Sequence, residues 1–186
     1  GVVGCAVGAP FAVLVAEQLF ASGCELLISV TSSGQLREVQ APPYFILIER
    51  ALRDEGTSYH YLPPSRFSEA PQSLLTTLDD AFDDLDVAVL RGATWTTDAP
   101  FRETETAIET MRATGLHAVE MEAAALYALA ASHGRRIVCF AHVTNQMGQI
   151  EGDFEKGEED GTRDALAVVR RTAARLMPSP QADNSG

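Results

Sequence analysis

AVEMEAAALYALA, residues 118–130, decides the fold class, because an apolar run ending near Glu120 turns into a pattern typical of a helix. Glu120 and Glu122 fall at this strand-to-helix junction, and at strand spacing residues i and i+2 point to the same face. Glu122 is therefore expected to project into a cleft, with Met121 packed beneath a ligand. The alternative is that both acids only complement the helix dipole, which is worth about 0.3 to 1 kcal/mol for each.

Outward from this junction, short apolar runs rich in β-branched residues alternate with helical patterns. Strands are predicted at Val2–Ala6, Leu26–Thr31, Tyr59–Leu62, Val87–Leu90 and Ile137–Val143. Helices are predicted at 10–20, 44–56, 70–85, 103–115, 121–134 and 158–177. The alternation predicts an α/β fold with three layers, α/β/α, around a twisted sheet that is mostly parallel or mixed. We expect one domain over 1–177 and a disordered tail over 178–186.

Composition excludes several classes of partner. The net charge of -12 argues against a nucleic acid or an anionic membrane as partner, because no basic patch offsets the repulsion. The three cysteines are odd in number and widely spaced, and no pair of histidines has metal-ligand spacing, so we expect neither disulfides nor a metal. No apolar run approaches the roughly 20 residues needed to span a bilayer. A reducing cytoplasm fits these observations best.

The turns that follow the predicted strands are the places to search for chemistry, since ligands of such sheets gather at the carboxyl ends of strands. In CAVGAPF, Gly8 allows a tight turn before a helix whose N–H groups suit an anion, although a turn that simply needs glycine explains it equally well. In ISVTSSGQL, the hydroxyls of Thr31, Ser32 and Ser33 with Gly34 form a neutral cradle for phosphate or sugar oxygens, or only cap a turn.

A third turn, RGATWTTDAPFRETE, combines flat and polar side chains. Trp95 and Phe101 offer flat faces, and the residues around them offer hydrogen-bond donors and acceptors, which together suit a heterocyclic base. The competing interpretation is that Asp98 is a turn residue and that Glu103 lies in the first turn of a helix.

Taken together, VEMEAAALYALA, ATWTTDAPF, AVGAPFAVLVAEQL and ISVTSSGQL resemble the nucleoside phosphorylase family. This family includes uridine phosphorylase and hexameric purine nucleoside phosphorylase, with methylthioadenosine/adenosylhomocysteine nucleosidases as hydrolytic relatives. The resemblance runs from the first residues to about Ala174, apparently without the family's N-terminal strand. It implies a pentosyltransferase that acts on a nucleoside with phosphate as co-substrate and without a cofactor. It also implies a homo-oligomer, either a dimer or a hexamer.

The resemblance implies a role for each matching residue. Glu122 matches the acid that holds the ribose hydroxyls, Met121 the residue beneath the sugar, and Glu120 a residue near the base or sugar. The phosphate side would be formed by Gly8, Ser32, Ser33 and Gly34, and the border of the base by Thr96, Thr97 and Phe101.

Two departures from the family's pattern bear on the reaction. In AHVTNQMGQ, Asn145 stands where purine phosphorylases carry a catalytic Asp, and Asn145-Gln146 stands where uridine phosphorylases carry Asn-Arg, so these two residues are the candidates for the contact with the departing base. Ser29 stands where phosphorylases carry a phosphate-binding Arg and nucleosidases a neutral residue. Phosphorolysis is the predicted reaction. Hydrolysis and nucleoside binding without turnover are the alternatives.

Overall fold

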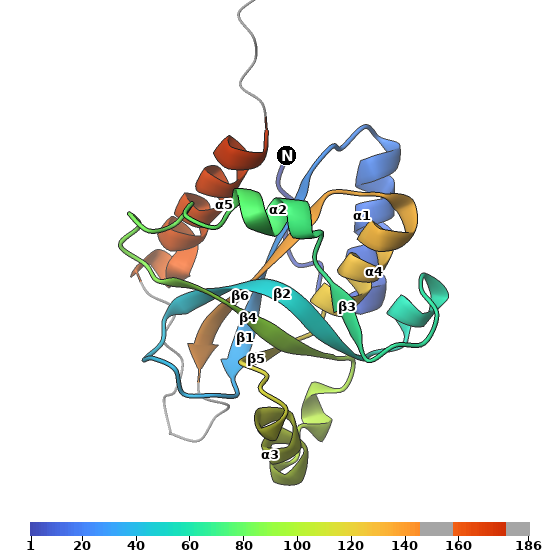
Figure 1. Cartoon of the computed structure of the whole chain (residues 1–186), viewed down its shortest axis with the longest axis vertical. Coiled ribbons are helices and arrows are strands. Elements are labelled where there is room, and N and C mark those ends of the chain that lie inside the picture. Colours follow the sequence, from blue (N-terminus) through green and yellow to red (C-terminus); the bar gives the residue numbers. More distant parts are fainter. Residues whose placement is uncertain (146–157, 178–186) are drawn as a thin grey trace, which may run out of the picture.

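A mixed sheet of six strands lies at the centre of the computed structural model, which describes residues 1–145 and 158–177. The strands are β1 (Leu27–Gln35), β2 (Tyr44–Asp54), β3 (Phe67–Glu69), β4 (Val89–Thr97), β5 (Ala118–Glu120) and β6 (Ile137–Asn145). Their order is β3-β2-β4-β5-β1-β6. An additional pairing between β2 and β6 closes β2, β4, β5, β1 and β6 into a ring, and β3 lies outside this ring. The sheet is strongly twisted (Figure 1).

The strand directions confirm the mixed α/β class predicted from the sequence. Strand β1 runs parallel to β6, and β4 runs parallel to both β2 and β5. Strand β1 is antiparallel to β5, and β2 is antiparallel to β3 and β6. Because β1, β4 and β5 end in the same part of the ring, the turns that follow them can contribute to one site.

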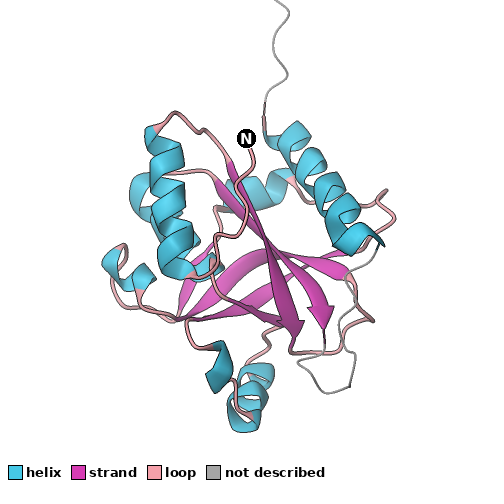
Figure 2. Cartoon of the chain, turned by 180° about the vertical axis from the view of Figure 1, so that it is seen from behind, coloured by secondary structure: helices cyan, strands magenta, loops and turns pink. Residues whose placement is uncertain are grey.

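Helices cover the sheet on two sides. They are α1 (Ala9–Ala21), α2 (Gln72–Thr77), α3 (Glu105–Ala113), α4 (Ala123–His133) and α5 (Thr162–Leu176), with short 3-10 helices η1 (Thr57–His60), η2 (Pro100–Arg102) and η3 (Glu158–Gly161). Helices α1 and α4 lie together on one side, α2 and α5 on the other, and α3 covers the opposite end of the sheet (Figures 1 and 2). None of these helices, within the described ranges, is long and apolar enough to cross a membrane.

Helix α4 is the centre of the main core. Its residues from Ala123 to Ala130 are all buried, as expected for a helix that is apolar all round. Its many alanines allow close approach, and it packs against α1, β2 and β3. A smaller core lies beneath α3 and contains Leu36, Leu52, Ala93, Trp95, Leu116 and Val119. The strand-to-helix junction at Glu120 is thus held between two packed regions.

One predicted helix, 44–56, is wrong: the segment forms strand β2 instead. Pro42 and Pro43 looked like a helix start, and ERALRD consists mostly of good helix formers. However, Tyr44–Ile48 are all buried, because β2 pairs with β4 and β6 on its two sides. A fully buried strand has no alternation of apolar and polar residues, so its period does not distinguish it from a buried helix.

Three further predictions are corrected. The segment Val2–Ala6 forms no strand, and Val2 is 94% exposed. The predicted strand Tyr59–Leu62 is instead the end of η1 followed by a turn. Near the start of η1, the N–H of Ser58 donates to Oε2 of Glu55 at 2.9 Å. The helix predicted over 70–85 is α2 alone, followed by turns in which acidic side chains pair with Arg91, Arg171 and Arg175.

The remaining predictions that can be compared are confirmed, with shifted ends. The helices predicted at 10–20, 103–115, 121–134 and 158–177 correspond to α1, α3, α4 and η3 with α5. The strands predicted at Leu26–Thr31, Val87–Leu90 and Ile137–Val143 correspond to β1, β4 and β6. However, the residues predicted as turns after the first two are wrong in part, because β1 continues to Gln35 and β4 continues to Thr97. The sequence pattern missed β3, which has only three residues. The tail predicted at 178–186 lies outside the described residues.

Candidate active site

A cavity of about 300 Å³ opens where β1, β5 and β6 end. Its walls combine hydroxyl, carboxyl, amide and apolar groups, and consist of Ser32, Ser33, Gly34, Pro100, Glu103, Val119, Glu120, Met121 and Asn145. Six of the residues predicted for the site are therefore brought together here, from segments far apart in the sequence: Ser32, Ser33, Gly34, Glu120, Met121 and Asn145. Such a mixture suits a ligand that is partly polar and partly flat.

Glu120 ends β5 and anchors the start of α4. One carboxylate oxygen, Oε2, accepts the backbone N–H groups of Glu122 and Ala123, each at 2.7 Å. The other, Oε1, accepts the hydroxyls of Thr94, at 3.0 Å, and Thr96. Burial raises the pKa of Glu120 to about 7, while its hydrogen-bond donors oppose that rise and the nearby charge of Glu122 adds to it. Glu120 thus reaches the cavity wall with its acceptor sites already occupied.

Glu122 is the residue before α4, and its side chain joins three segments. The N–H of Gly8, at the start of α1, donates to Oε1 at 2.6 Å, and the hydroxyl of Thr31 in β1 donates to Oε2 at 2.7 Å. The N–H of Met121 donates to Oε2 at 3.2 Å. Glu122 is 95% buried and is not among the residues that line the cavity, whereas its neighbour Met121 is. Since a carboxylate has about four acceptor sites, Oε1 keeps the capacity for one more donor.

The hydroxyl segment 31–34 lies within β1 and has one bonded and one unbonded serine. Ser32 is exposed, and its hydroxyl lies 3.2 Å from that of Thr144 in β6. Ser33 is only 3% exposed, and within the described part of the chain its hydroxyl has no hydrogen-bond partner. Gly34 follows at a break in the register between β1 and β6. A buried hydroxyl without a partner in a cavity wall is a natural contact for a polar ligand.

Asn145 ends β6, lies opposite Gly34 in the pairing of β1 with β6, and lines the cavity. Its Nδ2 donates to the hydroxyl of Thr144 at 3.4 Å, so a chain of polar groups runs from Asn145 through Thr144 to Ser32. Gln146, the other residue predicted to contact the departing base, lies outside the described residues.

Five described residues predicted for the site are not among those that line the cavity: Gly8, Thr96, Thr97, Phe101 and Glu122, which was expected to project into the cleft. The N–H of Gly8 is directed to Glu122, as described above. The hydroxyl of Thr96 is buried between Glu120 and the N–H of Ala124. Thr97 accepts the N–H of Ala99 at 3.2 Å, and Phe101 is fully exposed on η2. Thr96 therefore supports Glu120 in this structure, and Pro100 and Glu103 are the members of RGATWTTDAPFRETE that line the cavity.

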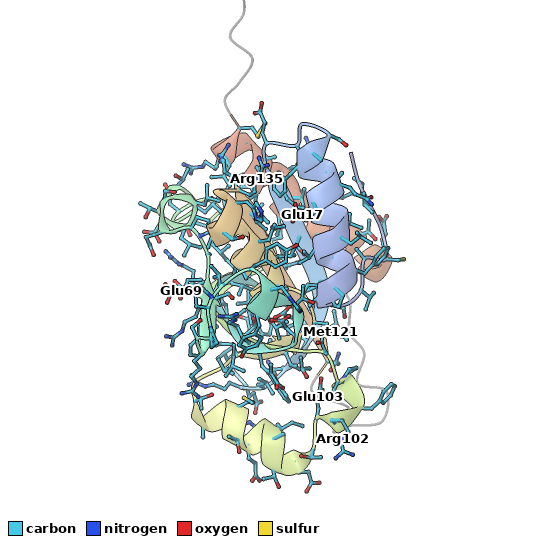
Figure 3. All side chains as sticks on the ribbon, turned by 90° about the vertical axis from the view of Figure 1, so that its right-hand side faces the viewer. Glu17, Glu69, Arg102, Glu103, Met121 and Arg135 are labelled. Atoms are coloured by element: carbon cyan, nitrogen blue, oxygen red, sulfur yellow. The ribbon has the colours of Figure 1, made fainter. Side chains whose placement is uncertain are left out.

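Sequence reasoning missed Glu103 as a member of the cavity. It follows η2, and Figure 3 shows it near Met121, with Arg102 farther from the sheet. Partial burial raises the pKa of the Glu103 carboxyl. The available signal was its place in FRETE, directly after the turn assigned to a flat base, but an acid before a helix is also a common first-turn residue.

The cavity carries acidic but no basic side chains among its described lining residues. Glu103 and Glu120 are the titratable groups there, and no lysine or arginine accompanies them. Ser29 lies within β1, paired with Cys139 of β6. An anion bound here would therefore depend on hydroxyl and N–H donors from the described residues.

Comparisons with known proteins identify the family of the chain. A family model described as the phosphorylase superfamily matches residues 1–176. The chain is 27% identical over 155 residues to a guanosine phosphorylase of Halorubrum lacusprofundi, covering 83% of this chain and 61% of the relative. It is 28% identical over 182 residues to a uridine phosphorylase of Thermococcus kodakarensis, covering 88% and 64%. A DeoD-type purine nucleoside phosphorylase of Colwellia psychrerythraea is 26% identical over 170 residues, covering 90% and 73%.

A solved structure has the same fold. It is a purine nucleoside phosphorylase of Toxoplasma gondii in complex with immucillin-H, with a TM-score of 0.79 and 19% identity, covering 91% of this chain and 71% of the other. The chain thus spans less than two thirds of the length of the guanosine and uridine phosphorylases that it matches.

Proposed function

The chain belongs to the phosphorylase superfamily, and from this premise we propose that it is a nucleoside phosphorylase. The reaction breaks the N-glycosidic bond of a nucleoside and forms a bond between the anomeric carbon and a phosphate oxygen, which gives free base and ribose 1-phosphate. The observation that carries the proposal is one cavity that is lined by residues 32–34 of β1, by Glu120 and Met121 at the junction of β5 and α4, and by Asn145 of β6.

The sugar would lie against Met121, with its hydroxyls held by Glu122. Cleavage of a glycosidic bond passes through a transition state in which the sugar resembles an oxocarbenium ion. A fixed carboxylate can orient the ring through its hydroxyls and stabilise the positive charge that develops on it. The place of Glu122 next to the cavity-lining Met121, with an acceptor site left on Oε1, supports this role.

Phosphate would lie against Ser32, Ser33 and Gly34. The hydroxyl of Ser33, which has no partner in the described residues, would donate to a phosphate oxygen. We assign the N–H of Gly8 to a different task, because it is directed to Glu122 at 2.6 Å.

The base would lie between Asn145, Pro100 and Glu103. The departing base must gain a proton or a hydrogen bond. The amide of Asn145 can donate a hydrogen bond, and partial burial raises the pKa of the Glu103 carboxyl, which favours the protonated form that can donate a proton. An amide beside a carboxyl also recognises both N–H and C=O groups on the edge of a base.

Hydrolysis of the same bond is the second candidate. It is favoured by Ser29 and by a cavity whose described lining has no cationic side chain. Water would then replace phosphate, and the products would be free base and ribose.

We further propose that the protein acts as a homo-oligomer in the cytoplasm and needs phosphate but no cofactor. The exposed apolar side chains of Phe11 and Leu14 on α1 and of Phe101 on η2 support contact with a second copy. The three cysteines are all unpaired, which suits a reducing compartment.

The test is release of free base from uridine, thymidine, inosine, guanosine, adenosine and methylthioadenosine, each with and without phosphate. Chromatography separates ribose from ribose 1-phosphate. We expect phosphate-dependent ribose 1-phosphate. Ribose formed without phosphate would establish hydrolysis instead, and no product from any nucleoside would contradict both. A Glu122→Gln protein purified in the same way controls for phosphorylases of the expression host.

A further inference from the structure

One wall of the cavity is formed by a segment that has no buried side chain. Residues 98–103, here called the η2 segment, contribute Pro100 and Glu103 to the cavity lining. None of the residues of the η2 segment is buried, and Phe101 at its centre is fully exposed. Packing into a core therefore does not fix the position of this wall, and its polar contacts gain in importance.

Asp98 connects the η2 segment to the rest of the fold. Its Oδ2 accepts the N–H of Gly56 at 2.9 Å, across 42 positions of sequence. Its own N–H donates to the carbonyl oxygen of Asp54, at 3.4 Å. Within the part of the chain that the structure describes, no other side chain of the η2 segment is hydrogen-bonded to a residue outside it.

Gly56 belongs to a well-supported part of the fold. Arg53, shortly before it, is only 4% exposed, and it donates to the hydroxyls of Ser58 at 2.8 Å and Ser65 at 2.7 Å. The N–H of Ser58 is in turn held by Glu55, and η1 packs against α1 and α4. The bond from Gly56 to Asp98 thus ties an exposed segment to a buried network of hydrogen bonds.

The position of Glu103 depends on the backbone of the η2 segment. The N–H of Arg102 donates to the carbonyl oxygen of Ala99 at 2.8 Å, and that of Glu103 to the carbonyl oxygen of Pro100 at 3.3 Å, so the segment is compact. The carboxyl of Glu103 forms no hydrogen bond or ion pair with another described residue, and partial burial alone raises its pKa. A shift of the backbone at Asp98 would therefore be transmitted to Glu103.

We propose that Asp98 is a positioning residue that holds Glu103 in the cavity wall by tying the η2 segment to Gly56. This inference rests on the proposed function, because it takes the base of a nucleoside to lie against Glu103. The proposed phosphate side is formed by residues 32–34 of β1, which the tie does not touch. Loss of the tie should thus raise the KM for the nucleoside and leave the KM for phosphate unchanged.

The experiment compares the wild type with Asp98→Ala and with Asp98→Asn, which keeps an oxygen that can accept the N–H of Gly56. For each protein, kcat and KM are measured for inosine and uridine at saturating phosphate, and KM for phosphate at saturating nucleoside. We expect the KM for the better nucleoside to rise about fivefold in Asp98→Ala, as for one lost hydrogen bond at an exposed site. Asp98→Asn should restore most of the affinity.

Two further variants serve as controls. Gly56→Ala keeps the N–H, and its Cβ would lie 3.9 Å from Oδ2 of Asp98, which is an ordinary contact distance. Asp83→Ala removes an exposed carboxylate from the turns after α2. Both variants should keep the KM values of the wild type.

A double-mutant cycle tests whether Asp98 acts through Glu103. Glu103→Ala removes the side chain that Asp98 is proposed to hold, so Asp98→Ala should raise the KM for the nucleoside less in that background than in the wild type. An equal rise in both backgrounds would overturn the inference, because Asp98 would then act elsewhere.

The remaining outcomes separate this inference from the proposed function. An active wild type whose KM for the nucleoside is unchanged in a folded Asp98→Ala protein would overturn the role of Asp98 alone. Equal rises in the KM for nucleoside and for phosphate would show a general loss of structure and would also overturn it. Calorimetric binding of the same nucleosides gives the same comparison if turnover is too slow, and Asp98→Leu replaces Asp98→Ala if the latter does not fold. A wild type that neither cleaves nor binds any nucleoside would contradict the proposed function, and this inference with it.

Discussion

Glu120 and Glu122 are identical side chains two residues apart, yet their surroundings assign them different tasks. Glu120 receives its hydrogen bonds from the two elements that it joins, β4 and the first turn of α4. Glu122 receives its bonds from the start of α1, from β1 and from its neighbour Met121. The first carboxyl fixes a helix to a sheet, and the second brings distant segments together beside the cavity. Strand β5 ends at Glu120, so the alternation of a strand does not extend to Glu122, and the predicted shared face does not form.

The largest expected effect is the loss of stability in Glu120→Ala, which removes the carboxyl that anchors α4. The change would leave the hydroxyls of Thr94 and Thr96 and two buried N–H groups without their acceptor, and would open a small void. We expect the free energy of unfolding to fall by about 4 kcal/mol, as measured by urea denaturation. Glu109→Ala, on the exposed surface of α3, is the matched control and should change stability by about 0.5 kcal/mol or less. Equal losses in the two variants would mean that Glu120 is not an anchor.

The next effect is a dependence of stability on pH. Burial raises the pKa of Glu120 from 4.5 to about 7 in the folded protein. Between these pH values the folded protein retains a proton that the unfolded chain has released, so stability falls as pH rises through this window. The contribution is about 3 kcal/mol, and it should appear as the difference between wild type and Glu120→Gln in urea denaturation from pH 4.5 to pH 8. Parallel curves for the two proteins would refute it.

The sequence predicted these two regions unequally, and the reason is physical. The strand-to-helix junction at Glu120 could be predicted because Gly115 and Gly134 bound the segment, and the apolar period changes within it. Strand β2 could not be predicted, because burial on both faces removes the alternation that marks a strand. The closure of the ring by β2 and β6 is a tertiary feature that no local pattern reports.

The site shows the same limit. Met121, Ser32 and Asn145 could be placed together because the sequence predicts each of them at or after the end of a strand, and such ends meet in one sheet. In the structure Asn145 ends β6 and Met121 follows β5, whereas Ser32 lies within β1. Sequence spacing did not show that Met121 rather than Glu122 lines the cavity, or that the N–H of Gly8 donates to Glu122. The contact of Gly8 depends on how α1 packs against α4. Glu103 was missed because its contact with the cavity comes from the path of the chain after η2, which carries no periodic signal.

The smallest of the three expected effects is the loss of activity in Glu122→Gln. Glu122→Gln keeps the size of the side chain and one acceptor oxygen for Gly8 or Thr31, but it removes the charge that would stabilise an oxocarbenium-like sugar. We expect kcat/KM for nucleoside cleavage to fall about a hundredfold, which corresponds to about 2.7 kcal/mol. The free energy of unfolding should change by about 1 kcal/mol or less, the reverse of the pattern for Glu120→Ala.

Both readouts must be taken on the same preparations, because a destabilised protein also loses activity by unfolding. Glu109→Gln, exposed on α3, supplies the matched control for loss of one negative charge. If Glu122→Gln lost stability as strongly as Glu120→Ala while its folded fraction kept full activity, both carboxyls would be structural anchors. The ribose would then have to be held elsewhere in the cavity. A large loss of activity with little loss of stability separates the anchor from the substrate-binding carboxylate, because the two changes act on bonds to different segments of the chain.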